Sequence, residues 1–164
     1  MRWRFRAASM NAITIKLLDD TQLAPAVSLL EAQLREHSIA SSPDALAAVL
    51  RTLSAQPERG FLLTACYNDA PVGVAYAACI LSLEYGGSSG WLEEFYVLPE
   101  WRGQGVGSSL LAAVIAAATT RGWPALDIEV DSAHQRVLSL YARSGFQPVS
   151  RTRFALRLLD GPVA

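Results

Sequence analysis

The fold is decided by the stretch WLEEFYVLPEWRGQGVG, residues 91–107. Residues 91–97 are mostly apolar and aromatic, which is typical of a strand, and they carry two adjacent carboxylates, Glu93 and Glu94. Three glycines follow within residues 102–107, and glycine permits positive φ angles and lets a ligand approach the backbone closely. The pattern predicts a strand that runs into a tight turn, where successive backbone N–H groups converge on an anion beside the two carboxylates.

A helix is predicted directly after this turn. Apolar residues recur there at helical spacing, and Arg121-Gly122 supplies a C-terminal stop; the apolar face consists of Val106, Leu110, Leu111, Val114, Ile115 and Ala118. The N-terminus of an α-helix carries partial positive charge and free N–H groups. Any phosphate group bound at the turn would therefore lie at the positive end of this helix.

The composition excludes several classes of protein. At 164 residues the chain is long enough for one domain, residues 1–164, whose core needs neither disulfides nor a metal. The formal net charge is −1 without a basic block, which argues against duplex nucleic-acid binding, and no apolar run is long enough to span a bilayer. The expected partner is a small molecule, with no nucleic acid and no membrane.

The cysteines and the first residues indicate a compartment. Cys66 and Cys79 lie in apolar, strand-like runs, so we expect free thiols in a reducing compartment, the cytoplasm. Residues 1–9 are basic and aromatic but have no apolar signal core, which predicts a disordered N-terminal extension, with Met10 as an alternative start.

The remaining sequence predicts an ordered series of elements. Periodicity and capping residues predict a strand, two helices, three antiparallel strands, the helix after the glycine turn, a further strand, a short helix and a closing strand. Because a long helix separates residues 91–97 from residues 126–130, these two strands are expected to lie parallel. The expected strands are 12–18, 61–67, 72–83, 91–97, 126–130 and 148–158, and the expected short helix is 134–144.

Two motifs resemble those of the GNAT superfamily of acetyl-CoA-dependent N-acetyltransferases. They are Arg102-x-x-Gly105-x-Gly107 after the strand, and Leu140-Tyr141-x-x-x-Gly145-Phe146 further along the chain. The order of the predicted elements is similar as well, over nearly the whole chain. The resemblance implies an α/β (α+β) GNAT fold, with a mixed, mostly antiparallel central sheet of about six to seven strands and about four helices on both faces.

Within the superfamily, residues 92–97 and 101–103 resemble the corresponding segment of the diamine acetyltransferases that modify spermidine and spermine. The resemblance implies that acetyl-CoA donates its acetyl group directly to a primary amine of a small cationic acceptor, such as a polyamine, a diamine or a basic amino-acid derivative. Protein N-termini, lysine side chains and aminoglycosides are alternatives in the same enzyme class. A non-catalytic acyl-CoA sensor or interaction module is the alternative of a different class.

Acetyl-CoA is assigned to the glycine turn and to the end of the strand before it. Backbone N–H groups of the turn are expected to hold the pyrophosphate; they belong to Arg102, Gly103, Gln104, Gly105, Val106, Gly107 and Ser108. The resemblance implies that the backbone of Phe95, Tyr96 and Val97 pairs with the pantetheine arm like an added strand, with the Val97 N–H facing the thioester oxygen.

Two competing interpretations of the turn and one departure from the family accompany this assignment. The glycines could serve only a tight strand-to-helix turn, and Gly103-x-Gly105-x-x-Ser108 partly fits a Rossmann fingerprint, although that motif belongs to the first βα unit of its fold. His134 stands where many family members have asparagine, and it is kept among the cofactor-binding residues.

Three side chains are candidates for the chemistry. The resemblance implies that Tyr141 returns a proton to the CoA thiolate, and a phenol of pKa about 10 can protonate a thiolate of pKa about 8.5; a plain core tyrosine is the alternative. Glu93 is assigned as the base, acting through a water, and Glu94 as the ligand of the substrate ammonium, with the reverse left open. Adjacent strand residues point to opposite faces unless a bulge intervenes.

Further expectations concern the surroundings of this site. Either carboxylate could instead pair with an arginine such as Arg143 or Arg151 on a partly solvated strand. No metal-ligand spacing is present, so no metal is expected. The loops 37–42 and 83–90 are expected to line the acceptor pocket, and the apolar composition permits a homodimer.

Overall fold

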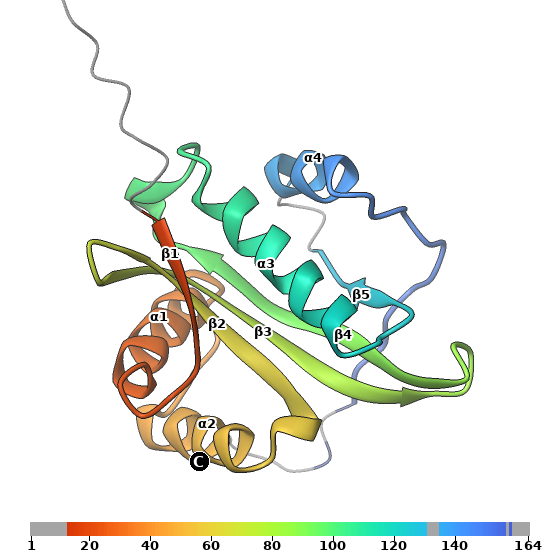
Figure 1. Cartoon of the computed structure of the whole chain (residues 1–164), viewed down its shortest axis with the longest axis horizontal. Coiled ribbons are helices and arrows are strands. Elements are labelled where there is room, and N and C mark those ends of the chain that lie inside the picture. Colours follow the sequence, from red (N-terminus) through yellow and green to blue (C-terminus); the bar gives the residue numbers. More distant parts are fainter. Residues whose placement is uncertain (1–12, 131–134, 157, 159–164) are drawn as a thin grey trace, which may run out of the picture.

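The computed structural model describes residues 13–130, 135–156 and 158. Five strands in these ranges form one sheet in the order β1-β2-β3-β4-β5 (Figure 1). Neighbouring strands are antiparallel, except that β4 and β5 are parallel, as the sequence predicts. The strands are β1 (Ile13–Leu17), β2 (Gly60–Tyr67), β3 (Ala70–Ser82), β4 (Gly87–Val97) and β5 (Leu126–Ile128).

Within the described residues, four α-helices cover the two faces of this sheet. The helices α1 and α2 lie on one face, and α3 and α4 lie on the other (Figure 1). Their bounds are α1 (Leu23–Glu36), α2 (Pro43–Ala55), α3 (Val106–Thr120) and α4 (Gln135–Arg143), with short 3-10 turns η2 (Pro57–Arg59) and η3 (Pro99–Trp101). None of these helices has the length and apolar character needed to cross a membrane.

Each face of the sheet has its own apolar core, as expected for a sheet between two layers of helices. The core under α3 contains Leu92 of β4, Leu110 of α3 and Tyr141 of α4, and the core under α1 contains Leu30 of α1, Val74 of β3 and Tyr96 of β4. The strand β2, which lies between β1 and β3, is buried along nearly its whole length, which explains why its sequence is continuously apolar and does not alternate.

Local signals in the sequence place the helices correctly. The Ser42 hydroxyl oxygen caps α2 by accepting a hydrogen bond from the Ala45 N–H at 3.3 Å, and Pro43 occupies the first helical turn. Before α1, one carboxylate oxygen of Asp19 accepts from the N–H groups of Thr21 and Gln22, at 2.8 and 3.0 Å. The Ser42 contact satisfies a backbone donor that a helix start leaves free, whereas the Asp19 contacts order the turn before α1, whose N-cap residue Gln22 makes no side-chain capping bond.

The prediction of a closing strand is wrong for the described part of residues 148–158, which forms no ladder, so the sheet has five strands there instead of six to seven. Two apolar residues of this segment, Phe154 and Leu156, are 90% and 83% exposed. Alternating residues form a strand only where an edge is available to pair with. The last strand of the sheet, β5, has three residues and so offers a short edge.

The pairing between β4 and β5 positions the site. Within the described residues the two strands pair at Gly90 with Leu126, Trp91 with Asp127, and Leu92 with Ile128. The ladder ends at Leu92, so none of the described residues forms a strand beside the second half of β4, which leads to the glycine turn, on the β5 side. Backbone N–H groups on that side of β4 are therefore available to a ligand, whereas the Val97 carbonyl is already bonded to Arg102 Nε.

Candidate active site

A β-bulge brings the two adjacent carboxylates to the same face of the sheet. In the β3–β4 ladder, Glu94 pairs with Tyr76 and Leu92 pairs with Ala77, so Glu93 is an extra residue without a partner on β3. Leu92 belongs to the core under α3, whereas Glu94 contacts Gln33 of α1 on the opposite face. The Glu93 carboxylate raises the pKa of both Glu94 and Tyr76 by charge repulsion, so it lies within electrostatic reach of that face, as a bulge that re-aims a side chain allows.

Glu94 is held in an environment that favours its neutral form. Burial, followed by the charge of Glu93, raises the pKa of the Glu94 carboxyl from 4.5 to about 7. Gln33 opposes this shift, because its Nε2 donates to Glu94 Oε2 at 2.5 Å. Glu94 is therefore divided between its ionised and neutral forms near neutral pH, whereas Glu93 is exposed to solvent.

Gln33 is a functional candidate that sequence reasoning missed. It is 6% exposed, and its Oε1 is a buried acceptor without a hydrogen-bond partner among the described residues. A buried acceptor without a partner costs free energy of folding. Gln33 is thus a residue that packing alone would not favour, and the only hydrogen bond of its side chain within the described residues is with Glu94. The signal was present in the sequence, since Gln33 is a polar residue on the apolar stripe of α1 formed by Ala26, Val27, Leu29 and Leu30.

Backbone directions at the end of β4 agree with the assignment of Val97. The Leu98 N–H donates to Val72 O on the β3 side at 2.9 Å. Because the N–H and C=O groups of one strand residue point to the same side and alternate along the strand, the Val97 N–H points away from β3, towards the side that β5 leaves free. Phe95, two residues earlier, presents its N–H to the same side.

The glycine turn presents free backbone donors at the start of α3. Gly103 and Gly105 have φ angles of +73° and +86°, a left-handed conformation that glycine adopts without strain. The Arg102 N–H is already used, donating to Pro99 O at 3.2 Å. From Gly103 to Ser108, by contrast, no backbone N–H makes a close hydrogen bond within the described residues, so the free donors begin one residue later than predicted.

The Arg102 side chain braces the turn. Its Nε donates to Val97 O at 2.8 Å, and its Nη2 donates to Glu36 Oε2, at the end of α1, at 2.7 Å. The guanidinium also lies 5.4 Å from the centre of the Tyr96 ring. Arg102 therefore ties the end of β4 to α1, and its charge is directed towards Glu36.

The other residues of the turn divide between core and surface. Val106 is 1% exposed and packs in the core, whereas the Gln104 side chain donates to Glu100 O at 2.6 Å. A Cβ atom at Gly107 would meet Leu140 at 3.6 Å and Phe95 at 3.9 Å, so the start of α3 passes close to α4 and β4. Ser108, in the first turn of α3, is exposed to solvent.

Tyr141 lies in the core under α3, close to the end of β4. It is 7% exposed, and its ring makes edge contacts with Phe95 at 6.1 Å and Phe146 at 5.5 Å between centroids. Burial raises the pKa of the Tyr141 phenol well above its usual range. Its hydroxyl makes no hydrogen bond to the described residues, and the phenol is protonated at neutral pH, but the same shift makes it a weaker acid than a free phenol.

The structure therefore brings together most of the predicted site. Glu93, Glu94, the end of β4 and the glycine turn belong to one continuous stretch of chain, and Tyr141 reaches it through Phe95. His134 lies outside the described residues. Arg143 and Arg151 pair with neither carboxylate: Arg143 donates to the Ser139 hydroxyl oxygen at 3.3 Å, and Arg151 forms an ion pair with Glu84 at 2.7 Å.

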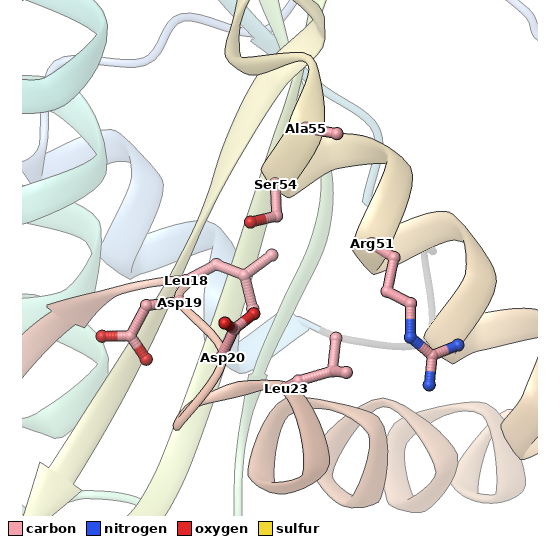
Figure 2. Close-up of a pocket in the computed structure, with 7 residues that line it drawn as sticks. All are labelled: Leu18, Asp19, Asp20, Leu23, Arg51, Ser54 and Ala55. Carbon is pink, nitrogen blue, oxygen red and sulfur yellow. The ribbon is translucent and has the colours of Figure 1, made fainter.

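Two hollows lie on the same face of the sheet as α1 and α2. One of about 420 Å³ is at the end of α1 and is lined by Glu31, Arg35, Ser38, Ile39, Ala40 and Ser41, so it includes most of the loop expected to line the acceptor pocket. The other, of about 260 Å³, is lined by residues from the turn before α1 and from α2, including Asp20 and Arg51 (Figure 2). It lies at the end of β1 remote from the glycine turn.

Comparison with known proteins identifies the family. The model of the acetyltransferase (GNAT) family matches residues 26–146. A thialysine N-epsilon-acetyltransferase of Bos taurus is 29% identical over 136 residues, covering 82% of this chain and 75% of that protein. An aminoglycoside N(6')-acetyltransferase of Stenotrophomonas maltophilia is 32% identical over 126 residues, covering 70% of this chain and 80% of that protein.

A solved structure agrees on the fold. An aminoglycoside N-acetyltransferase in complex with CoA superimposes with a TM-score of 0.76 at 21% identity, covering 90% of this chain and 95% of that one. The fold and the family-model match over residues 26–146 thus agree. The chain belongs to the acetyltransferase (GNAT) family of acyltransferases.

Proposed function

We propose that this protein transfers an acetyl group from acetyl-CoA directly to a primary amine of a small cationic acceptor, such as a diamine, a polyamine or a basic amino-acid derivative. The observation that carries the proposal is the half-buried Glu94 with a pKa near 7, next to the exposed Glu93. Two relatives are named as acetyltransferases of thialysine and of aminoglycosides, and these names support an amine acceptor.

The glycine turn fits the pyrophosphate of acetyl-CoA. Successive free N–H groups from Gly103 to Ser108 at the start of a 15-residue helix form an anion site. The free side of β4 after Leu92 fits the amide-containing arm, which can pair with backbone groups as a strand would. The CoA bound to the structural relative supports this assignment.

Glu94 is the better candidate for the base, which exchanges the roles assigned from the sequence. A primary amine of pKa about 10.4 is almost entirely protonated at pH 7, with on the order of one molecule in a thousand free. A base acts best when its own pKa is near the working pH, and the Glu94 pKa of about 7 meets this condition. Glu93, exposed and one residue away, is suited to attract the incoming ammonium.

The remaining steps of the transfer use groups at the end of β4 and on α4. The neutral amine attacks the thioester carbon, and the Val97 N–H stabilises the oxyanion that forms. The C–S bond then breaks, and the CoA thiolate takes a proton from the Tyr141 hydroxyl. The nitrogen gives up two protons in all: Glu94 takes the first from the ammonium, and the second leaves the nitrogen for solvent as the intermediate collapses. Solvent then returns one proton to Tyr141, so the net products are the amide, the CoA thiol and the proton held by Glu94.

The test is thiol release from acetyl-CoA with a panel of acceptors. The panel comprises butylamine, 1,4-diaminobutane, spermidine, lysine, an aminoglycoside and a peptide with a free N-terminus. Turnover of the small cationic amines, lost in Glu94→Gln, supports the proposal. Turnover of the peptide alone indicates a protein acetyltransferase. No turnover with any acceptor, while acetyl-CoA still raises Tm, indicates the acyl-CoA sensor; cytoplasmic location and homodimerisation stay predictions of the sequence.

A further inference from the structure

A cationic side chain of the protein itself lies beside the proposed amine site. The Arg153 guanidinium carbon is 5.8 Å from the centre of the Trp91 ring, and its Nη1 is paired with Glu129 Oε2. The Glu93 carboxylate also acts on Arg153 through space, favouring its charged form. One guanidinium is thus surrounded by an aromatic face and two carboxylates.

These groups share one face of the sheet. Trp91 pairs with Ala78 and alternates with Leu92, so its ring lies on the α1 side, as Glu94 does. Glu129 follows Ile128, whose side chain packs in the core under α3, so Glu129 points to the α1 side as well. Trp91 and Glu129 therefore lie on the same face as Glu94, where β4 and β5 separate after Leu92 and Ile128.

The segment that carries Arg153 is held weakly. Figure 1 shows the chain after α4 passing around the β5 edge of the sheet towards the face covered by α1 and α2. Its other anchor is the ion pair of Arg151 with Glu84, whose side chains are 69% and 58% exposed. Exposed ion pairs contribute little, and Phe154 and Leu156 bury almost nothing, so a ligand can displace the segment at small cost.

We propose that Trp91, Glu129 and Glu93 form a second cation subsite, which binds the distal cation of a dicationic acceptor and which Arg153 occupies when no acceptor is bound. The proposal rests on the proposed function for the position of the reacting amine. An aromatic face attracts an alkylammonium as it attracts a guanidinium, so the two cations compete for one place. The acceptor class is thereby narrowed to amines with a second positive charge a few methylene groups away.

Kinetics with two acceptors test the competition. Arg153→Gln removes the internal cation, so we expect KM for 1,4-diaminobutane and spermidine to fall roughly 2- to 5-fold, with KM for butylamine unchanged. Trp91→Leu should raise KM for the diamines by a similar factor. Arg151→Gln is the matched control, because it removes a charge from the same segment outside the subsite. A KM that rises in Arg153→Gln, or changes equally for mono- and diamines, overturns the proposal.

A binding measurement separates the subsite from the acetyl transfer. Hexamethonium carries two quaternary ammonium groups and cannot be acetylated, and tetramethylammonium carries one. Calorimetric titration should show tighter hexamethonium binding in Arg153→Gln than in the wild type, and loss of that gain when Trp91→Leu is added. If this pattern appears without turnover of any amine, the proposed function fails and the subsite stands. If hexamethonium binds equally to all variants, the subsite is refuted.

Discussion

Replacing Gln33 with leucine should move the acid limb of the pH–rate profile upwards. The Gln33 amide lowers the pKa of Glu94 through its 2.5 Å hydrogen bond, against the burial and the repulsion by Glu93 that raise it to about 7. Leucine removes this donor together with the unpaired Oε1. The substitution removes both polar groups of the amide, the Nε2 donor and the unpaired Oε1, so no buried polar atom of residue 33 is left unpaired. We therefore expect the fold to tolerate the change.

The size of the shift follows from the hydrogen bond. A hydrogen bond to a charged group is worth about 1.5–3 kcal/mol, which corresponds to roughly 1–2 pKa units. In the wild type, about half of Glu94 is ionised at pH 7. With the pKa raised by that amount, roughly 1–10% would be ionised at pH 7, so kcat/KM at pH 7 should fall roughly 5- to 50-fold and should recover above pH 9.

The assay is kcat/KM for thiol release between pH 5.5 and 9.5, a range on the order of two units either side of the pKa. Glu93→Gln is the matched variant of opposite sign, because loss of its charge should lower the pKa of Glu94 and move the acid limb downwards. Glu94→Gln should abolish the limb. If Gln33→Leu leaves the limb unmoved or shifts it to lower pH, another group is the base and the roles proposed for Glu93 and Glu94 are wrong.

Three further changes test other parts of the site. Gly105→Ala imposes a side chain at φ +86°, which should lower the free energy of unfolding by about 1–2 kcal/mol. It should also weaken acetyl-CoA binding in a calorimetric titration. The control Gly86→Ala, at φ +69° on the β3–β4 hairpin, should lose similar stability without weakening that binding. Tyr141→Phe keeps its ring contacts, so Tm and CoA affinity should persist while kcat falls roughly 100-fold or more; an unchanged kcat would exclude Tyr141 as the acid. Glu94→Gln should stabilise the protein at pH 8 but not at pH 4. Because the folded-state pKa of Glu94 is raised, the free energy of unfolding of the wild type falls as pH rises from 4.5 to about 7, by about 1–2 kcal/mol after screening. Equal Tm differences between variant and wild type at both pH values would contradict this.

The sequence predicts the strand, turn and helix of the site because each depends on neighbours along the chain. The helix face beginning at Val106 and the cap at Ser42 are examples, since periodicity and capping are local properties. The parallel arrangement of β4 and β5 follows from the connecting helix, which is also legible in sequence.

The bulge at Glu93 could not be predicted, because it depends on the register between β4 and the distant residues Tyr76 and Ala77 of β3. The same limit explains the wrong prediction of a strand at residues 148–158: alternation describes one chain, and pairing needs a second edge. Gln33 could have been found, as a polar residue inside an apolar stripe, but its partner Glu94 lies 61 residues away and only the fold brings the two together.

The helix α1 touches both halves of the reaction within one turn. Gln33 holds the proposed base, and Glu36, three residues later, holds the arginine that braces the glycine turn. Three residues of α-helix span about 4.5 Å along the axis. The helix therefore fixes the separation between its contact with Glu94, the proposed base, and its contact with Arg102, which braces the glycine turn. If the proposed roles hold, a surface loop can change shape without altering this separation.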